Sequence, residues 1–358
     1  MSGVDHRVTE GASLVAGVDV GGTKVAALVV DTDGATLGRA ERPMTVRSGA
    51  AGIEPIVGAV RAALDAAGAA GTDLAAIGVG VPGRVDPETG VVGLATNLGW
   101  RDVPLARLLE AEFGVICAVE NDVHLAAAGL VGHEAAGGAR SLAYVAVGTG
   151  IGAGLVLDGR LHRGGRGMAG EIGHIVVEPA GVVCRCGQRG CLETVASGPA
   201  VARRAAEEVA AGTDTSLRDT QPLNAKAVYD AARAGDPLAL RLVDAAGGAL
   251  ARAIAGLVLT CDVERVLLGG GVAGAGDVFL QPILAELERL RSNSALLSEL
   301  LPLGTVRLLA AHFDAVAWGG VALALRARGS ARESPPGPRT GTRPAAVVEE
   351  VVAREPLT

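Results

Sequence analysis

Three cysteines and one histidine gather in a short stretch of this 358-residue chain. His174 precedes Cys184, Cys186 and Cys191, so the spacing is His-x9-Cys-x-Cys-x4-Cys. One imidazole and three thiolates form a ligand set that zinc takes in closed, tetrahedral sites. Buried thiols in an ordinary loop are the alternative, but so dense a cluster favours a metal. We expect this zinc to shape a loop, because a closed site leaves no position for a reactive water.

Glycine-rich turns occur at three places where backbone N–H groups can face phosphate oxygens. Their residues are Gly21, Gly22, Thr23 and Lys24, then Gly148, Thr149 and Gly150, then Gly269, Gly270 and Gly271. The first turn resembles a P-loop, but Thr precedes Lys and a strand pattern follows where a P-loop requires a helix. One such turn is consistent with a plain hairpin. Three together predict a nucleotide held between two lobes.

Two further stretches carry carboxylates. In "VENDV", Asp122 lies where a strand gives way to a helix, and this stretch alone favours a helix N-cap. A carboxylate at the end of a strand can also serve as a general base for a sugar hydroxyl, and the two roles are compatible. In "GEIGH", Glu171 and His174 lie just before the cysteines, and Glu193 lies just after them. A zinc-folded loop would present these groups in one direction, where they suit sugar hydroxyls. The alternative for the glutamates is an ordinary solvated pair.

The elements that position these residues fall into two similar halves. The turn at Val20–Thr23 and the turn at Val147–Gly150 lie between apolar strands, and the second strand of each pair ends in an aspartate, Asp31 or Asp158. This predicts a duplication at domain scale. The expected division is a flexible segment 1–13, a first lobe 14–121 joined by a last helix 315–328, a second lobe 122–314 with the zinc loop, and a disordered tail 329–358. A helix is also expected at 123–137.

Composition narrows the class of protein. The net charge of −7 argues against a nucleic-acid surface. Five cysteines are too few for a disulfide scaffold, which predicts a cytoplasmic protein. Neither a secretory signal nor a membrane span is expected, because the segment 1–13 is charged and no long uncharged apolar run occurs. Lys24 and Lys226 are the two lysines of the chain, so lysine at position 24 is an unusual choice.

Taken together, the motifs resemble the ROK family of bacterial sugar kinases and related regulators, most of all its ATP-dependent glucokinases. The stretches that carry the resemblance are "GVDVGGTK", "GVGVPGRVD", "NLGW", "VEND", "VGTGIGAG", "GEIGH", "CRCGQRGCLE" and "LLGGGV", between Leu14 and Arg328. The resemblance implies an α/β, two-lobed, actin-like ATPase (ribonuclease H-like) fold with duplicated lobes and a cleft. It also implies ATP with Mg²⁺, structural Zn²⁺, a hexose in the cleft and a homodimer.

Carried over by position, the resemblance makes Asp122 the catalytic base for phosphorylation of a hexose, most often glucose at its 6-hydroxyl. It makes the three glycine turns the nucleotide site, and His174 with the three cysteines the zinc ligands. The sugar ligands that it implies are Gly83, Asn97, Asn121, Glu171, His174 and Glu193. One departure is visible: the kinases often read Asn-Asp-Ala-Asn where this chain has "NDVH", with His124.

Other functions stay open at this point. The chain could phosphorylate another hexose or an N-acetylated hexosamine, because these sugars share one set of hydroxyl-binding groups. Polyphosphate could replace ATP as the donor. The "NDVH" form also resembles the regulator branch of the family, which would make the protein a sugar-sensing repressor. The segment before Leu14 is shorter than a helix-turn-helix module needs, so we expect an enzyme.

Overall fold

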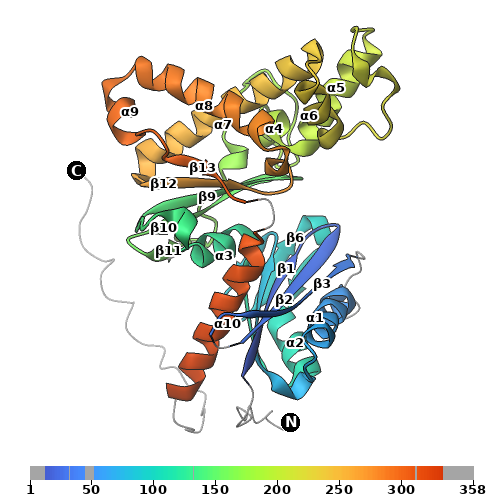
Figure 1. Cartoon of the computed structure of the whole chain (residues 1–358), viewed down its shortest axis with the longest axis vertical. Coiled ribbons are helices and arrows are strands. Elements are labelled where there is room, and N and C mark those ends of the chain that lie inside the picture. Colours follow the sequence, from blue (N-terminus) through green and yellow to red (C-terminus); the bar gives the residue numbers. More distant parts are fainter. Residues whose placement is uncertain (1–12, 32, 45–51, 132, 311–312, 334–358) are drawn as a thin grey trace, which may run out of the picture.

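The computed structural model describes residues 13–31, 33–44, 52–131, 133–310 and 313–333. The segment predicted to be flexible lies outside the described residues up to residue 12, and the predicted tail lies outside them from residue 334. The described part consists of two α/β lobes, one above the other in Figure 1, with helices α3 and α10 beside the place where they meet.

The first lobe is built on a five-stranded sheet. Its strands, in spatial order, are β3 (Thr36–Pro43), β2 (Lys24–Val30), β1 (Leu14–Val20), β4 (Leu74–Val81) and β8 (Ile116–Asn121). β1 pairs antiparallel with β2 through the glycine turn and parallel with β4, which confirms the predicted hairpin. The central strands β1 and β4 are apolar apart from Asp19 because helices cover both faces of the sheet. α1 (Glu54–Ala66) packs on β2 and β3, whereas α10 (Ala315–Glu333) packs on β1 and β4.

The second lobe repeats this topology. Its sheet has the order β11 (Arg160–His162), β10 (Ile151–Leu157), β9 (Leu142–Val147), β12 (Arg265–Gly269) and β13 (Val306–Leu308). Here too the first hairpin is antiparallel, and the crossover strand β12 lies parallel to β9. β1 ends at Val20 and β9 ends at Val147, so each first strand runs into its glycine turn at the predicted place. The shared strand order confirms the predicted duplication.

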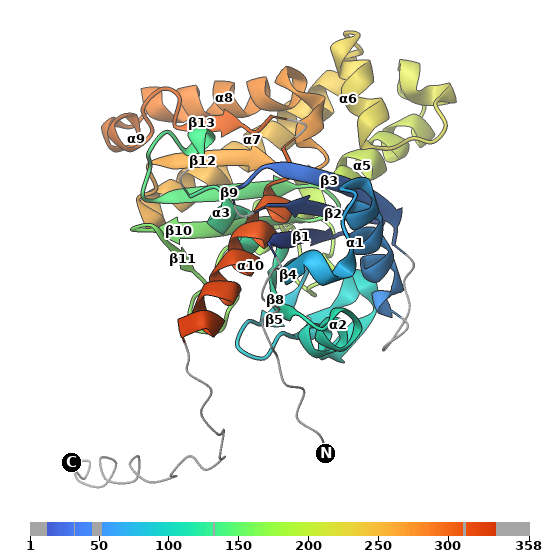
Figure 2. The same ribbon diagram turned by 60° about the horizontal axis from the view of Figure 1, so that its bottom comes forward.

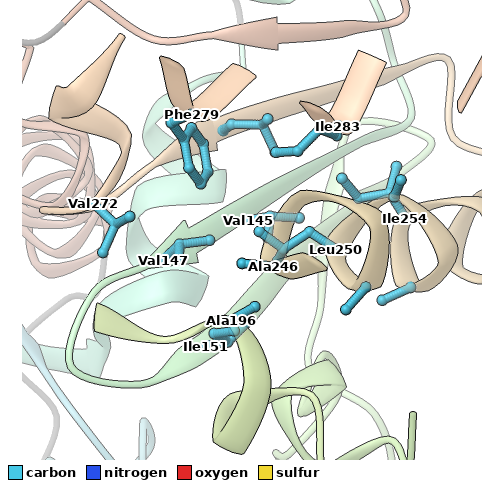
Figure 3. Packing of buried hydrophobic residues seen from close by; sticks show 14 of the residues in the cluster. Val145, Val147, Ile151, Ala196, Ala246, Leu250, Ile254, Val272, Phe279 and Ile283 are labelled. Carbon is cyan, nitrogen blue, oxygen red and sulfur yellow. The ribbon is translucent and has the colours of Figure 1, made fainter. Parts of the chain in front are cut away.

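A layer of helices covers one face of the second sheet. It consists of α4 (Glu193–Ala196), α5 (Gly198–Ala210), α6 (Ala225–Arg233), α7 (Pro237–Cys261), α8 (Asp277–Ser292) and α9 (Ala295–Leu300). Val145 and Val147 of β9 pack against Leu250 and Ile254 of α7, with Phe279 of α8 closing the cluster (Figure 3). α7 is long and apolar enough to cross a membrane, but 67% of its most apolar window is buried inside this lobe. Packing in the core therefore accounts for its composition.

Helix α10 belongs to the first lobe although it comes from the far end of the described chain (Figures 1 and 2). Gly17 of β1 and Gly78 of β4 are partners in the sheet. A Cβ atom at Gly17 would lie 1.9 Å from the carbonyl oxygen of Ala317, and one at Gly78 would lie 2.0 Å from that of Gly320. These glycines therefore form a groove in which the helix backbone touches the sheet. α10 continues through Glu333, so the prediction that the tail begins at 329 places the end of the helix too early.

A small antiparallel sheet was not foreseen from the sequence. It comprises β5 (Arg84–Asp86), β6 (Val91–Ala95) and β7 (Trp100–Val103) and precedes α2 (Leu105–Phe113). A short 3₁₀ helix at Thr96–Leu98 joins β6 to β7 and carries Asn97. The helix predicted at 123–137 is also shorter than expected. α3 runs from Asp122 to Gly129 and stops where Gly129 meets the backbone of α10 at Gly319.

Candidate active site between the lobes

Asp122 begins helix α3 directly after strand β8 of the first lobe. Its Oδ1 accepts a hydrogen bond from the Val123 amide at 2.9 Å, and its side chain is half-buried. Burial raises the pKa of Asp122; the Val123 amide opposes this effect, and the charge of Glu171 adds to it. The carboxylate therefore binds a proton more tightly than an ordinary aspartate, and it lies within electrostatic reach of the Glu171 loop.

Asn121, and not Asp122, is the N-cap of α3. Its Oδ1 accepts from the His124 amide at 3.1 Å, and its Nδ2 donates to the carbonyl oxygen of Gly83 at 3.0 Å. The alternative in which Asp122 serves as the cap is therefore wrong. Asn121 fastens the start of α3 to the Gly83 loop, and thus holds the neighbouring carboxylate in place.

Glu171 and His174 lie on a loop that follows β11 of the second lobe. The Glu171 carboxylate lies 3.8 Å from Nε2 of His174, and nearly half of its side chain is exposed. Gly170 allows this loop to approach the sheet, because it has φ of +93° and a Cβ there would lie 1.8 Å from the carbonyl oxygen of Ala153. The backbone of β10 at Ala153 thus fixes the residue that precedes Glu171.

The four predicted zinc ligands meet in space. Their ligand atoms all lie within 4.8 Å of one another, in the group His174, Cys184, Cys186 and Cys191. Nδ1 of His174 lies 3.7 Å from Sγ of Cys184, and the sulfurs of Cys186 and Cys191 lie 3.6 Å apart. Zn–S bonds of about 2.3 Å in a tetrahedron place two sulfurs about 3.8 Å apart. The donor set and its spacing therefore fit a zinc ion.

The thiols of this cluster differ in acidity. The backbone amide of Gln188 lowers the pKa of Cys186, whereas burial raises the pKa of Cys191 to about 12. A thiol as weakly acidic as Cys191 becomes a thiolate at neutral pH when a cation replaces its proton. Metal binding at this group would therefore release protons.

Glu193 connects the loop that carries Cys184, Cys186 and Cys191 to the second glycine turn. Its Oε2 accepts from the Ile151 amide at 3.2 Å, and a Cβ at Gly150 would lie 2.6 Å from that oxygen. The guanidinium of Arg185 lies 3.9 Å from the other oxygen of Glu193 and donates to Oδ1 of Asn97 at 3.3 Å. Arg185 thus bridges the two lobes between two predicted sugar ligands. Sequence reasoning missed it, because an arginine in a loop carries no signal of its own.

The three glycine turns are divided between the lobes. Gly270, at the end of β12, has φ of +87°, and Val272 donates to the carbonyl of Val147, which brings the third turn against the second. The carbonyl of Gly148 accepts from the Gly198 amide at the start of α5. The first turn lies in the other lobe, where the side chain of Asn97 is 3.8 Å from a Cβ at Gly22.

Lys24 has a partner of its own. Its ammonium group donates to Glu41 of β3 at 2.8 Å, and both side chains are exposed. A surface ion pair of this kind contributes little to stability. The lysine can therefore exchange Glu41 for an incoming anion.

Two acidic residues near Asp122 were not singled out from the sequence. Asp19 lies near the end of β1, and Asp314 caps α10 by accepting from the Ala317 amide at 3.0 Å. Burial raises the pKa of Asp19 well above its ordinary value, and the charges of Asp314 and Asp122 raise it further. A lone carboxylate within the apolar run "LVAGVDV" was the signal that could have revealed Asp19.

The fold and this site define a two-lobed actin-like ATPase. The sequence pattern of the ROK family matches residues 15–323, and the chain belongs to that family. A glucokinase from Halalkalibacterium halodurans is 40% identical over 278 residues, which cover 76% of this chain and 84% of the relative. A putative xylose repressor from a Caldicellulosiruptor species is 31% identical and covers 82% of this chain and 73% of the repressor.

Among solved structures, a ROK family glucokinase from Streptomyces griseus in complex with glucose and AMPPNP is similar. Its TM-score is 0.74 at 32% identity, with 87% of this chain and 99% of that chain covered.

Proposed function

We propose that the protein is an ATP-dependent glucokinase that converts glucose to glucose 6-phosphate. The observation that carries the proposal is the half-buried carboxylate of Asp122 at the start of α3. Burial raises the pKa of this group, and Glu171 lies close enough for its charge to act on it. The likeness to glucokinases in sequence and in structure supports the same activity.

In this mechanism Asp122 accepts the proton of the sugar 6-hydroxyl. The hydroxyl oxygen forms a bond to the γ-phosphorus of ATP, the bond between that phosphorus and the β–γ bridging oxygen breaks, and ADP leaves. Asp122 then returns the proton to solvent. General-base assistance of this kind typically contributes about 10²–10⁴-fold to the rate. Glu171, His174, Glu193 and Asn97 would orient the sugar hydroxyls, because their polar groups border the same space between the lobes.

The nucleotide would lie between the glycine turns. Backbone N–H groups at 21–23, 148–150 and 269–271 would face its phosphates, and Lys24 would add a positive charge. Asp19 and Asp314 would suit a Mg²⁺ ion that accompanies the nucleotide, because burial and then the charges of Asp314 and Asp122 raise the pKa of Asp19, and a cation there would offset both effects. Such an ion neutralises phosphate charge during the transfer.

The zinc ion would have a structural role. His174, Cys184, Cys186 and Cys191 would close its coordination sphere, and the loop that they fold carries Glu171 before the metal and Glu193 after it. His174 could then bind the metal through Nδ1 and face the sugar through Nε2.

Several features of the proposal extend beyond the active site. We propose that the first lobe comprises residues 14–121 together with the helix at 315–328, and that the second lobe comprises residues 122–314. Assembly as a homodimer and a cytoplasmic location remain predictions from the sequence. The relationship to a putative repressor keeps a sugar-sensing role as the second candidate, and retention of Asp122 favours the enzyme.

A coupled ADP-release assay tests the proposal. The zinc-loaded protein is given ATP with glucose, mannose, allose or N-acetylmannosamine in turn, and then polyphosphate in place of ATP. We expect the highest kcat/KM with ATP and glucose. Higher values with another sugar would revise the substrate, and transfer from polyphosphate would revise the donor. The absence of hexose-dependent turnover with either donor would contradict the kinase.

A further inference from the structure

Two charged side chains are buried next to Asp122 without being part of the proposed mechanism. Glu120 on β8 is 2% exposed, and His124 on α3 is 3% exposed. Burial of ionisable groups is costly unless they are paired and hydrogen-bonded. Glu120 and His124 lie on either side of the proposed base, Asp122, in the sequence, so their partners bear on how this part of the site is held.

Both residues bind the loop that leads to Glu171. Oε2 of Glu120 accepts from Nε of Arg163 at 2.6 Å and lies 2.6 Å from Nη2 of the same guanidinium. Nε2 of His124 lies 2.9 Å from the carbonyl oxygen of Ala169, and its Nδ1 lies 3.6 Å from Oε1 of Glu120. β8 belongs to the first sheet, whereas Arg163 follows β11 of the second sheet. The Glu120–Arg163 contact therefore joins the two lobes, and the His124–Ala169 contact fastens the same loop to α3.

The segment 163–169 is a closed loop held at both ends. The Ala169 amide donates to the carbonyl of Arg163 at 3.0 Å, which closes the loop on itself. The Arg163 side chain fastens one end of the loop to Glu120, and the Ala169 carbonyl fastens the other end to His124. Glu171 follows Ala169 closely in the sequence, with only Gly170 between them. Release of either contact would loosen the backbone that leads to Glu171, which is then held only further along, where the Gly170 carbonyl accepts from the Ala153 amide at 2.8 Å.

The geometry requires a proton on Nε2 of His124, and the nearby Glu120 carboxylate favours a second proton on Nδ1. A carbonyl oxygen can only accept, so Nε2 must donate to Ala169, and Nδ1 faces the carboxylate of Glu120. Burial alone would lower the pKa of His124, but the hydrogen bonds to Glu120 and Ala169 and the charge of Glu120 outweigh it, and the net shift is upward. The other charged groups that act on it are Arg163, which opposes its charge, and Asp122 on its own helix.

We propose that Glu120, His124 and Arg163 are positioning residues that tie the Glu171 loop to helix α3, and that protonated His124 sets the affinity for sugar. The sugar part rests on the proposed function. Because the folded pKa of His124 lies above its ordinary 6.5, its attraction to Glu120 is complete below that pH and is lost as the pH rises through the higher value, which weakens the tie. Sugar affinity therefore weakens on the alkaline side.

The kinetic test compares His124→Asn with the natural protein across pH. Asparagine cannot bear the charge, so we expect the glucose KM to rise on the order of ten-fold, as for loss of one charged hydrogen bond. We expect kcat to stay within about three-fold, since Asp122 is retained. The rise of KM with pH seen in the natural protein should be absent from the variant. His162→Asn is the matched control, because His162 is exposed and adjacent to Arg163.

An unchanged pH dependence of KM in His124→Asn would overturn the proposal. So would a fall in kcat as large as the fall in kcat/KM, because that result would place His124 in the chemical step. Arg163→Met provides a second route if His124→Asn folds poorly, since the Arg163 side chain is 39% exposed. Arg163→Met should raise the glucose KM, as His124→Asn does, and leave the ATP KM unchanged.

Hydrogen exchange separates this proposal from the kinase assignment. The Ala169 amide donates to Arg163 within the loop, and the Ile172 amide donates to Gly170 directly after it. Both amides should exchange faster in His124→Asn and Arg163→Met than in His162→Asn. Equal exchange in all three variants would overturn the tie, whatever the enzyme does. Faster exchange in a protein that phosphorylates no hexose would retain the tie and reject the proposed function.

Discussion

The two lobes share one strand order, yet their equivalent turns carry different chemistry. In the first lobe, strand β1 brings Asp19 and its turn brings Lys24. At the matching positions of the second lobe the chain has Ala146 in β9 and Ile151 in β10, which offer only backbone groups to a phosphate. The second lobe instead carries the cysteine loop after β11. Duplication thus supplied two similar frames, and charge and metal ligands were distributed unequally between them.

The change with the largest expected effect is Asp122→Asn at the junction of the lobes. We expect kcat to fall by about two orders of magnitude or more, because asparagine cannot accept the proton. Burial raises the pKa of Asp122, so its carboxylate opposes folding above that pKa, and the variant should melt at the same or a higher temperature. Steady-state kinetics and thermal melting on one preparation measure both effects.

The matched control for that change is Asp277→Asn in the second lobe. Asp277 is also the first residue of a helix, α8, but it is exposed. Its variant should keep kcat. The pH profile adds a further check: kcat of the natural enzyme should fall as acid protonates Asp122, at a higher pH than for an ordinary aspartate. Near-normal turnover in Asp122→Asn would remove Asp122 as the base.

Loss of the metal should produce the next largest effect, confined to the second lobe. We expect about one zinc per chain, and Cys186→Ala should lose it, melt at a lower temperature and raise the glucose KM. The reason is that the same loop places Glu171 and Glu193. Elemental analysis, melting and kinetics measure this, with Cys261→Ala as the control because Cys261 ends α7 outside the cluster. Folded, active protein without zinc would contradict the site.

Lys24→Ala tests whether the first lobe supplies the charge for the nucleotide. We expect the ATP KM to rise on the order of ten-fold or less, because loss of a charged hydrogen bond is reduced by exposure and by the competing Glu41. Glucose affinity should stay unchanged. Lys226→Ala is the matched control, since Lys226 pairs with Asp230 on α6. A large loss of glucose affinity at constant ATP KM would contradict the assignment of Lys24 to the nucleotide and place it with the sugar instead.

The smallest expected effects are on stability. They come from removing one helix cap in each lobe. Asn121→Ala and Ser197→Ala should each cost about 1 kcal/mol in the free energy of unfolding, the typical value for an N-cap. Asn121 should cost more, because it also donates to Gly83, whereas Ser197 accepts a single bond from Ala200. Urea unfolding measures both. Equal or smaller loss in Asn121→Ala would show that the Gly83 contact contributes nothing.

The sequence predicted features with local signals. The apolar runs on both sides of Val20–Thr23 predicted a hairpin, and the repeat at Val147–Gly150 predicted the second sheet. The group His174, Cys184, Cys186 and Cys191 could be anticipated because its three cysteines lie close together in the sequence, and the four side chains come together in the structure. Clusters of glycines and cysteines are informative in a sequence because few roles other than tight turns and metal binding require these residues at such density.

Features that depend on distant partners were not predictable. The charge of Asp314, near the end of the described chain, acts on Asp19, near its beginning, and Arg163 reaches Glu120 from a different sheet. The sequence favours Asp122 as the cap of α3, but a strand-to-helix transition permits either of two neighbouring residues to fill that role, and the structure has Asn121 there. The register of β8 against β4 decides between them, since it places Asn121 opposite Val81, next to the loop whose Gly83 carbonyl receives its amide.

The last described helix has a consequence for how the chain acquires its structure on the ribosome. α10 fills the glycine groove of β1 and β4, but it begins at Ala315, whereas β1 already ends at Val20. At about 5–20 residues per second, synthesis takes roughly 15–60 s to pass from one of these positions to the other. During this interval one face of the first sheet lacks its helix, while the second sheet, made later, already has its helices within reach. The lobe that is made first is therefore completed last.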